Sequence, residues 1–414
     1  MTRISEQPFD GLSGRRVLYL TTVLPHGRQS GGEICSMNFI EALQNARCKV
    51  DVVGYEREDQ SAPAPLPAGF SSPRRLVIES AQSPTRSALW MTHALLNARP
   101  FSVQKYVTRE MMDLVRHKLR SSRWDLVIID HIQAAWLLAA LPDDLPVVYV
   151  AHNIEHRLYG AYENRVAKGL RGKAKSFAYR REARLVHDLE RRTAQRAQAV
   201  WTLTDDDAAA FRSLADRGVP VRSFSVPGQR FAHVDRLPPP RTDIGLLGSW
   251  TWDINRVGLD WFLAEVVPQL PVDLNVVVGG KSRYAPGTQI GRVRFVGFVP
   301  DAGAFLRECR VVVIPTTIGS GVQIKTIETL SLGVATVATP IAMRGLRDVP
   351  SSVRVESDAA RMSAAIEDLL HAQRGDGAEG RRWWEQRQAT FQSQIKDALD
   401  DLLADARQHP NHQD

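Results

Sequence analysis

The sequence is poor in cysteine and contains no long apolar run. Its three cysteines, Cys35, Cys48 and Cys309, are too few and too scattered for a disulfide framework or a thiolate metal site. No window approaches the eighteen apolar residues that a membrane span needs, and residues 1–16 lack the continuous apolar stretch of a secretory signal. These absences predict a cytoplasmic protein and leave open peripheral contact with the inner face of the cell membrane.

The composition is that of an ordinary globular protein. The chain has 414 residues, 43% of them hydrophobic and 24% charged, which excludes disorder, collagen and coiled coil as the dominant state and favours two or three domains. The formal net charge is +7, and residues 155–196 alone carry twelve Lys/Arg against five Asp/Glu. Such a basic segment either attracts phosphate groups or forms a solvated helix face.

The first half of the chain alternates strand and helix patterns. An apolar run at residues 16–21 leads into a glycine-rich loop at 27–32, a helical pattern at 33–45 and a second strand pattern at 49–54. This order is typical of a βαβ unit, whose parallel strands imply an α/β domain. Further strand patterns lie at residues 125–131, 147–153 and 199–204.

The second half repeats this alternation after a proline-rich stretch. We therefore expect an α/β fold of two Rossmann-like domains facing a cleft, and such clefts often bind small molecules. The predicted division is a flexible lead at 1–15, a first Rossmann-like domain at 16–225, a linker at 226–241, a second Rossmann-like domain at 242–395, and a C-terminal helix and tail at 396–414.

Polar side chains follow two predicted strands of the first domain. His131 ends the strand pattern at 125–131, and His152 and Asn153 end the next one. Ligands of open parallel sheets bind outside the carboxyl ends of the strands, so these residues are candidates for substrate contact. The alternative is that they are satisfied core side chains or cap their turns.

A second candidate site lies in the segment at residues 318–340. Gly319, Ser320 and Gly321 precede a helix pattern that carries Lys325 in its first turn and Glu328 three residues later. Backbone N–H groups at a helix start attract phosphate, Lys325 adds a cation, and the carboxylate of Glu328 suits ribose hydroxyls. The alternative is an ordinary surface pair behind a glycine turn.

This segment resembles the donor-binding signature of GT-B glycosyltransferases of family 4, the glycosyl transferases group 1. Glu328, Gly333 and the pair Thr339-Pro340 match the family pattern of a glutamate, a glycine five residues later and a strand that ends in Thr-Pro. One position departs from it: Ser320 stands where the commonest form has a first glutamate, which contacts the donor sugar in relatives.

The resemblance extends to other parts of the chain. Gly248-Ser249, Asn255-Arg256 and residues 261–263 look like the start of the family's donor domain, and Val299 lies in a segment similar to its nucleobase-side loop. The pair Gly31-Gly32 looks like the glycine loop of the first domain that approaches the donor phosphates.

The resemblance implies a glycosyltransferase that moves a sugar from a nucleotide-sugar to an acceptor hydroxyl, with retention. Lys325, Arg256 and the glycine backbones would neutralise the leaving diphosphate, Glu328 would hold the ribose and His131 would orient the sugar. The departure at Ser320 keeps open a catalytically silent partner that binds sugar nucleotides, and a GT-B nucleotide-sugar epimerase is another alternative.

No cofactor or metal is expected besides the nucleotide-sugar substrate. Residues 204–207, Thr-Asp-Asp-Asp, form a helix start rather than a metal-binding Asp-x-Asp. The basic segment at 155–196 also contains aromatic residues, which suits an acceptor glycan linked to a lipid or an anionic membrane surface, or a bland surface. Nothing in the chain matches a nucleic-acid-binding module.

Overall fold

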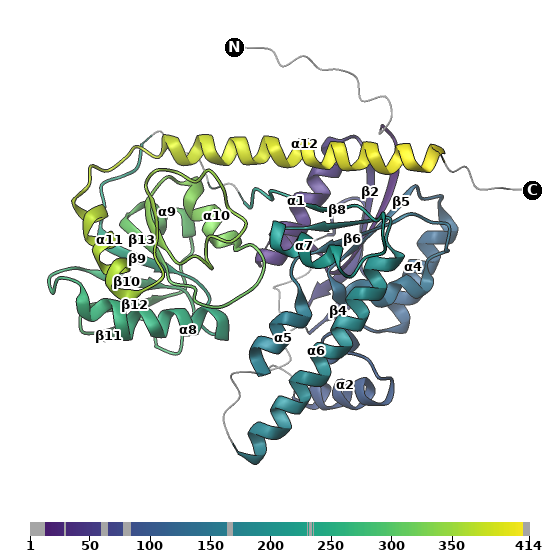
Figure 1. Ribbon diagram of the computed structural model, residues 1–414, viewed down its shortest axis with the longest axis horizontal. Coiled ribbons are helices and arrows are strands. Elements are labelled where there is room, and N and C mark those ends of the chain that lie inside the picture. The colour runs from purple at the N-terminus through teal and green to yellow at the C-terminus, as the bar shows by residue number, and fades with distance from the viewer. Residues whose placement is uncertain are drawn as a thin grey trace, which may run out of the picture. The chain divides into compact units, whose positions relative to one another are not determined.

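The computed structural model describes residues 13–28, 30–58, 65–77, 84–163, 169–229, 231, 234 and 236–408. The chain divides into two compact units (Figure 1). Unit 1 comprises Met1–Phe224 and Phe391–Asp414, and unit 2 comprises Ser225–Thr390. Most of the predicted lead (1–12) and the end of the predicted tail (409–414) lie outside the described residues.

Unit 1 is built on a parallel sheet with the strand order β3-β2-β1-β5-β6-β7-β8, in which β4 also pairs with β2. The strands are β1 (Arg16–Val23), β2 (Lys49–Arg57), β3 (Phe70–Ser71), β4 (Arg75–Leu76), β5 (Leu126–Asp130), β6 (Val147–Ala151), β7 (Ala199–Thr202) and β8 (Val221–Ser223).

Helices and short helical turns connect successive strands of unit 1 along the chain (Figure 1). They are η1 (Pro25–Gly27), α1 (Gly31–Asn45), α2 (Pro84–Leu96), α3 (Phe101–Gln104), α4 (Arg109–Ser121), η3 (Ile132–Ala140), α5 (Glu155–Glu163), α6 (Leu170–Arg196) and α7 (Asp205–Arg212).

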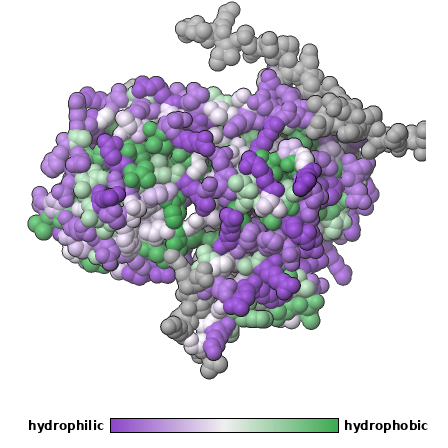
Figure 2. All heavy atoms as spheres, viewed as in Figure 1, coloured by the Kyte–Doolittle hydropathy of each residue, from purple (hydrophilic) through white to green (hydrophobic). Residues whose placement is uncertain are grey.

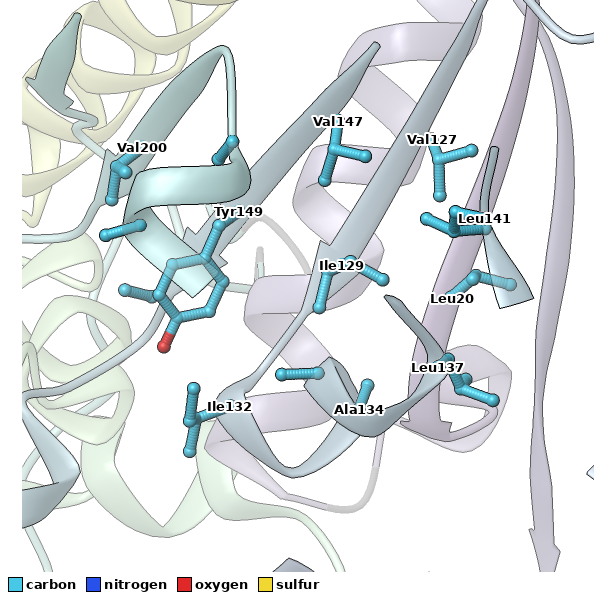
Figure 3. Close-up of a cluster of buried hydrophobic side chains, with 14 of the residues drawn as sticks. Leu20, Val127, Ile129, Ile132, Ala134, Leu137, Leu141, Val147, Tyr149 and Val200 are labelled. Carbon is cyan, nitrogen blue, oxygen red and sulfur yellow. The ribbon is translucent and has the colours of Figure 1, made fainter. Parts of the chain in front are cut away.

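The central strands of unit 1 are apolar because helices cover both faces of the sheet. β5 and β6 are buried over their whole length, which accounts for their continuous Val/Ile sequences. Figure 3 shows Ile129, Val147 and Tyr149 of these strands packed with Ile132 and Leu137 of η3. This core fixes the carboxyl ends of β5 and β6, where the polar residues follow.

Unit 2 has a second sheet, with the order β11-β12-β10-β9-β13-β14-β15. All its pairs are parallel except β11 with β12. Its elements are β9 (Thr242–Leu247), α8 (Asp253–Trp261), η4 (Phe262–Val266), η5 (Val267–Gln269), β10 (Val276–Gly279), β11 (Gln289–Ile290), β12 (Val293–Gly297), α9 (Ala302–Arg307), β13 (Cys309–Ile314), α10 (Ile324–Ser331), β14 (Ala335–Ala338), β15 (Val353–Val355) and α11 (Ala359–His371). The prediction of two Rossmann-like α/β domains is confirmed.

The long helix α12 (Ala378–Gln408) belongs to both units. In unit 2, the Trp384 indole N–H donates to the carbonyl of Pro227 over 2.7 Å. In unit 1, the Phe391 ring lies 5.2 Å from that of Phe39. The division therefore differs from the expected one: α12 runs unbroken through the expected boundary at 395, and the proline-rich residues 226–241 belong to unit 2.

Side-chain caps set the start of two helices in unit 1. The Thr204 side chain accepts a hydrogen bond from the Asp207 N–H over 3.1 Å, so the predicted helix cap at residues 204–207 is confirmed. Helix α1 starts at Gly31, two residues earlier than expected. The cause is Ser30, whose hydroxyl accepts a hydrogen bond from the Glu33 N–H over 3.3 Å and donates one to the Glu33 carboxylate over 3.2 Å.

Within the described residues, no helix combines the length and the apolarity needed to cross a bilayer.

Candidate functional site

Each sheet has one pair of neighbouring strands at which the chain switches from adding strands on one side to adding them on the other. In unit 1 this pair is β1 and β5, and in unit 2 it is β9 and β13. Connections leave such a pair on opposite faces of the sheet, which opens a crevice at the carboxyl ends of the two strands. The predicted site residues gather beyond these ends.

Asp130 connects three other polar side chains of the unit 1 site by hydrogen bonds. It ends β5 and is fully buried. One carboxylate oxygen pairs with Nε2 of His152 at 2.7 Å, and the other accepts hydrogen bonds from the Thr21 and Ser36 hydroxyls at 2.8 and 2.6 Å. Burial raises the pKa of Asp130, but the two neighbouring histidines and these hydrogen bonds outweigh it and leave the pKa below its usual range. The carboxylate therefore stays ionised.

His131 and His152 stack on each other beside this carboxylate. Their ring centroids are 3.6 Å apart, with an interplanar angle of 27°. Burial, followed by the neighbouring His152, lowers the pKa of His131 to about 3. His131 is thus a neutral imidazole at physiological pH, able to donate or accept one hydrogen bond at each nitrogen. It does not cap its turn, because its side chain makes no capping hydrogen bond at η3.

The backbone at His131 is held in an unusual conformation. Its φ is +66°, a region that non-glycine residues seldom adopt and that often marks functional positions. Gly32, in the first turn of α1, faces the ring: a Cβ on Gly32 would lie 3.4 Å from His131 Cε1. Gly31 and Gly32 therefore bring the unpaired N–H groups of a helix start beside the neutral imidazole.

Asn153, the other polar residue after β6, contacts helix α5 and forms none of the hydrogen bonds described for Asp130. Its side-chain amide donates to Glu155 Oε1 over 3.3 Å. Burial raises the pKa of Glu155, while this hydrogen bond lowers it. Asn153 thus has a local carboxylate partner in α5.

Asp130, His131 and His152 also have the residue types of a metal site, since their ligand atoms lie within 4.8 Å of one another. The hydrogen-bond pattern argues for a different role. Both carboxylate oxygens of Asp130 already accept hydrogen bonds, and a metal ion would have to displace them. The cluster fits a hydrogen-bonded framework that positions the two imidazoles.

Lys325 is the central cation of the unit 2 site. It lies in the first turn of α10, after the cap residue Gln323. Its ammonium donates to Asn255 Oδ1 over 2.9 Å and lies 5.6 Å from the Trp250 ring centroid. Burial lowers its pKa to about 8. Among the described residues, no carboxylate forms an ion pair with Lys325, so its charge at the helix start is uncompensated.

Asn255 is aimed at Lys325 by the loop after β9. Its amide nitrogen donates to the carbonyl of Ser249 over 2.9 Å, which turns the amide oxygen toward the ammonium. Ser249 is exposed and its hydroxyl lies 3.3 Å from that of Thr251. Gly248 packs on the indole, since a Cβ there would lie 3.3 Å from Trp250. The structure thus joins Gly248, Ser249 and Asn255 to Lys325.

Glu328 does not pair with Lys325. Burial raises the pKa of Glu328 to about 7, against the opposing effect of a hydrogen bond from the Gln229 backbone. Neither group affects the pKa of the other, so an ordinary surface ion pair is excluded for these two residues. Glu328 is a half-buried carboxylate whose charge is easily stabilised by an added hydroxyl donor.

Arg256 differs from Lys325 because carboxylates compensate its charge. Its guanidinium donates to Asp253 Oδ1 over 2.9 Å and lies 3.3 Å from Asp260 Oδ2, both in the same helix α8. A diphosphate would compete with these two partners. Arg256 therefore carries less unbalanced positive charge than Lys325 does.

The remaining predicted site residues lie in the loop before α10 and just after β12. Gly319 and Gly321 have φ values of +142° and +71°, conformations that glycine adopts without strain. They flank Ser320, in the segment that joins β13 to α10. Val299 packs beside the end of β10, because a Cβ on Gly279 would lie 2.8 Å from Val299 Cγ2.

Two protein-family models match the chain. The glycosyl transferase 4-like domain matches residues 30–223, and glycosyl transferases group 1 matches residues 241–372. Together they take in most of the chain. The fold and these matches define a GT-B glycosyltransferase. Residues 30–223 thus form a glycosyl transferase 4-like domain and residues 241–372 a glycosyl transferases group 1 domain, so the predicted resemblance and the predicted transferase class are confirmed.

Solved structures of similar fold cover most of the length of the protein. Sucrose-phosphate synthase from Thermosynechococcus elongatus has a TM-score of 0.64 at 16% identity, covering 94% of this chain and 98% of that one. Trehalose 6-phosphate synthase from Burkholderia multivorans has 0.56 at 14%, covering 96% and 100%. HepE from Anabaena, in complex with UDP, has 0.55 at 13%, covering 94% and 100%. No curated protein sequence matches the chain.

Three site residues escaped the sequence analysis. Thr21 and Ser36 hold Asp130, and Trp250 faces Lys325. Trp250 directly follows the Gly248-Ser249 pair that the family resemblance singles out, so its position was a usable signal. Thr21 and Ser36 carried no such signal, because a hydroxyl partner more than ninety residues from Asp130 depends on the folded sheet.

The hydrogen bonds to Asp130 predict a pH-dependent stability of unit 1. Replacing Asp130→Asn should lower the free energy of unfolding by about 2–4 kcal/mol at pH 7, since a charged acceptor of three hydrogen bonds is lost. The folded pKa is depressed, so this contribution is present above the unfolded pKa of about 3.9 and declines as pH falls below it. Denaturant unfolding of both proteins at pH 7 and pH 2.5 measures it, because the contribution is complete at pH 7 and reduced at pH 2.5; an equal difference at both values would contradict the account.

Proposed function

We propose that this glycosyltransferase takes its sugar from a nucleoside-diphosphate donor and transfers it to an acceptor hydroxyl. The observation that carries the proposal is the half-buried ammonium of Lys325 at the start of α10, which pairs with no carboxylate among the described residues. A leaving diphosphate is the anion that this position would stabilise, together with the backbone N–H groups near Gly319–Gly321. Glu328 would accept hydrogen bonds from the ribose, and Arg256 would give secondary support.

The unit 1 residues would act on the transferred sugar and the acceptor. A neutral His131, held by stacking on His152 and by the Asp130 framework, can hydrogen-bond a sugar hydroxyl without adding charge. The N–H groups at Gly31 and Gly32 would contact the donor phosphates. Asn153 would add a polar contact on the acceptor side.

The proposed stereochemistry is retention through a front-face reaction. The bond between the anomeric carbon and the phosphate oxygen breaks while the acceptor oxygen bonds to the same face, and the acceptor proton passes to the leaving phosphate. The nearest carboxylate to His131 belongs to Asp130, which is buried with both oxygens engaged. It is poorly suited to act as a covalent nucleophile.

The proposed acceptor is a glycan, either lipid-linked or a precursor of a surface polysaccharide. The support is the basic α6, which carries exposed Lys173 and Lys175 near a cluster of tyrosines; the Lys175 ammonium lies 5.6 Å from the Tyr179 ring centroid. Cations among aromatic rings suit a phosphate-bearing carrier at an anionic membrane surface.

The Lys325 pKa predicts how donor binding depends on pH. A thermal-shift screen with UDP, GDP, ADP and TDP first selects the nucleoside diphosphate. Its affinity should then fall about fivefold to tenfold from pH 7 to pH 9, as Lys325 loses its proton while the diphosphate, with a pKa near 6, stays ionised.

Variants of Lys325 isolate this effect. Lys325→Met should bind at least about tenfold more weakly at pH 7. Lys325→Arg should show a much smaller fall in affinity up to pH 9, because a guanidinium keeps its proton and only Glu328, with a pKa of about 7, still titrates in the site. Isothermal titration provides the affinities. Wild-type affinity in Lys325→Met, or the same pH slope in Lys325→Arg, would refute the diphosphate site.

The ribose role of Glu328 predicts a coupling between this residue and the ribose hydroxyls. Glu328→Ala should weaken binding of the selected nucleoside diphosphate by about tenfold. The 2′,3′-dideoxy form of the ligand should bind the wild type and Glu328→Ala about equally, since the hydroxyls that Glu328 holds are absent. If the dideoxy ligand suffers the same loss as the parent ligand, Glu328 does not bind the ribose.

The role of His131 predicts a split between binding and turnover. His131→Asn, chosen because asparagine tolerates positive φ better than most residues, should lower donor turnover about a hundredfold while nucleoside diphosphate affinity stays within about twofold. Donor hydrolysis or transfer measures turnover, and the unfolding midpoint checks the fold. Unchanged turnover would remove His131 from the site.

A further inference from the structure

Helix α2 presents an apolar face that the described part of the chain leaves uncovered. Leu89, Leu95 and Leu96 are 56%, 57% and 79% exposed, although exposed leucines normally occur singly. Figure 2, in the same view as Figure 1, shows hydrophobic atoms gathered where α2 lies in unit 1.

The exposed leucines share one side of the helix. With 100° between successive residues, Ser87, Trp90 and Ala94 point to one side, and these are the less exposed positions of α2. The opposite side carries no charged residue and consists of Thr85, Ala88, Leu89, Thr92, Leu95 and Leu96. Arg86 and His93 lie at its margin. The exposed side is thus uncharged and carries three leucines, which can insert into the interface of a membrane.

The base of α2 is held firmly on α6. Arg181 of α6 donates to the carbonyls of Ala94 and Arg99, at 2.9 and 3.3 Å. The next residue, the buried Glu182, accepts from the N–H groups of Phe101 and Ser102, at 2.8 and 2.9 Å. The apolar face is thus presented by a fixed helix end rather than by a loose segment.

Helix α6 adds cations and a further apolar side chain alongside α2. Phe177, 69% exposed, and the exposed Lys173 stand one and two turns before Arg181 on the same side of α6. Residues 84–109 and 169–181 contain no Asp or Glu and carry four and five Lys/Arg. Neighbouring acids pair with two of these, Glu58 with Arg86 and Glu163 with Arg180.

We propose that this face of unit 1 docks onto an anionic lipid bilayer, with the α2 leucines inserted among the acyl chains and the α6 cations against the headgroups. We refer to it as the α2 face: Leu89, Leu95 and Leu96 of α2 with Lys173 and Phe177 of α6. A second copy of the chain fits less well, since a symmetric contact would bring like charges together. All residues of the α2 face belong to unit 1, so the docking does not depend on the unit 2 site. It would place the enzyme at the membrane that holds the proposed lipid-linked acceptor.

The test is flotation of the full chain with lipid vesicles at low salt. Vesicles of phosphatidylcholine with about one third phosphatidylglycerol should bind the wild type at least about fivefold better than pure phosphatidylcholine. Leu95→Gln/Leu96→Gln, which leaves the charge unchanged, should lower this binding about tenfold. Lys173→Gln should lower it about threefold and reduce its dependence on salt.

A matched control uses exposed apolar residues of unit 2. Val272→Gln/Ile290→Gln removes side chains that are 83% and 45% exposed, and it should bind vesicles within about twofold of the wild type. Absence of wild-type binding to anionic vesicles, or equal loss in both double variants, would overturn the proposal. So would a dimer in the wild type that becomes a monomer in Leu95→Gln/Leu96→Gln, because the α2 face would then join two copies.

Donor binding in the same preparations separates this proposal from the proposed function. Every variant should bind the selected nucleoside diphosphate as the wild type does, since the α2 face contains no residue of the unit 2 site. A wild type that binds vesicles but no nucleoside diphosphate would contradict the proposed donor alone, and the reverse result would contradict the docking alone.

Discussion

The unit 2 site depends on one unbalanced charge. Lys325 is withdrawn from water at the start of a helix, where the helix dipole already disfavours a cation. The fold keeps it there through close packing: Gly258 of α8 approaches the end of β13 so tightly that a Cβ would lie 2.0 Å from the Pro315 carbonyl oxygen. Helix α8 thereby holds Asn255 against the ammonium. A bound anion would balance this charge, as the proposed function requires.

The unit 1 site has the opposite electrostatic character. Asp130 is buried but fully hydrogen-bonded, and the imidazole of His131 is neutral. Such a network resists reorganisation, since moving any one member leaves a buried charge without its partners. A rigid neutral surface suits recognition of sugar hydroxyls, whereas the cation of unit 2 suits a leaving group that gains negative charge. The two units thus divide the proposed chemistry by charge.

The sequence predicts the two α/β domains and most site positions, because buried parallel strands are continuous apolar runs and ligand residues follow their ends. It also predicts the helix cap at Thr204. It assigns no element between residues 55 and 124. For α2, which lies there, the reason is that Ala94 is its one fully buried residue among those whose side chains the structure describes, so the helix shows little of the periodic pattern of a core helix. The hydrogen-bond partners of Asp130, and the finding that no described carboxylate forms an ion pair with Lys325, depend on the tertiary structure and cannot be read from the spacing of residues along the chain.

The most direct test of the central claim is the pKa of Lys325 itself. Titration of the lysine side chains by heteronuclear NMR, with assignment by comparison with Lys325→Arg, should show one ammonium that titrates near pH 8 in the free protein. A saturating nucleoside diphosphate should raise this pKa toward or above the ordinary value of about 10.4. A Lys325 that titrates at the ordinary value in the free protein, or whose pKa is unmoved by the ligand, would contradict the account.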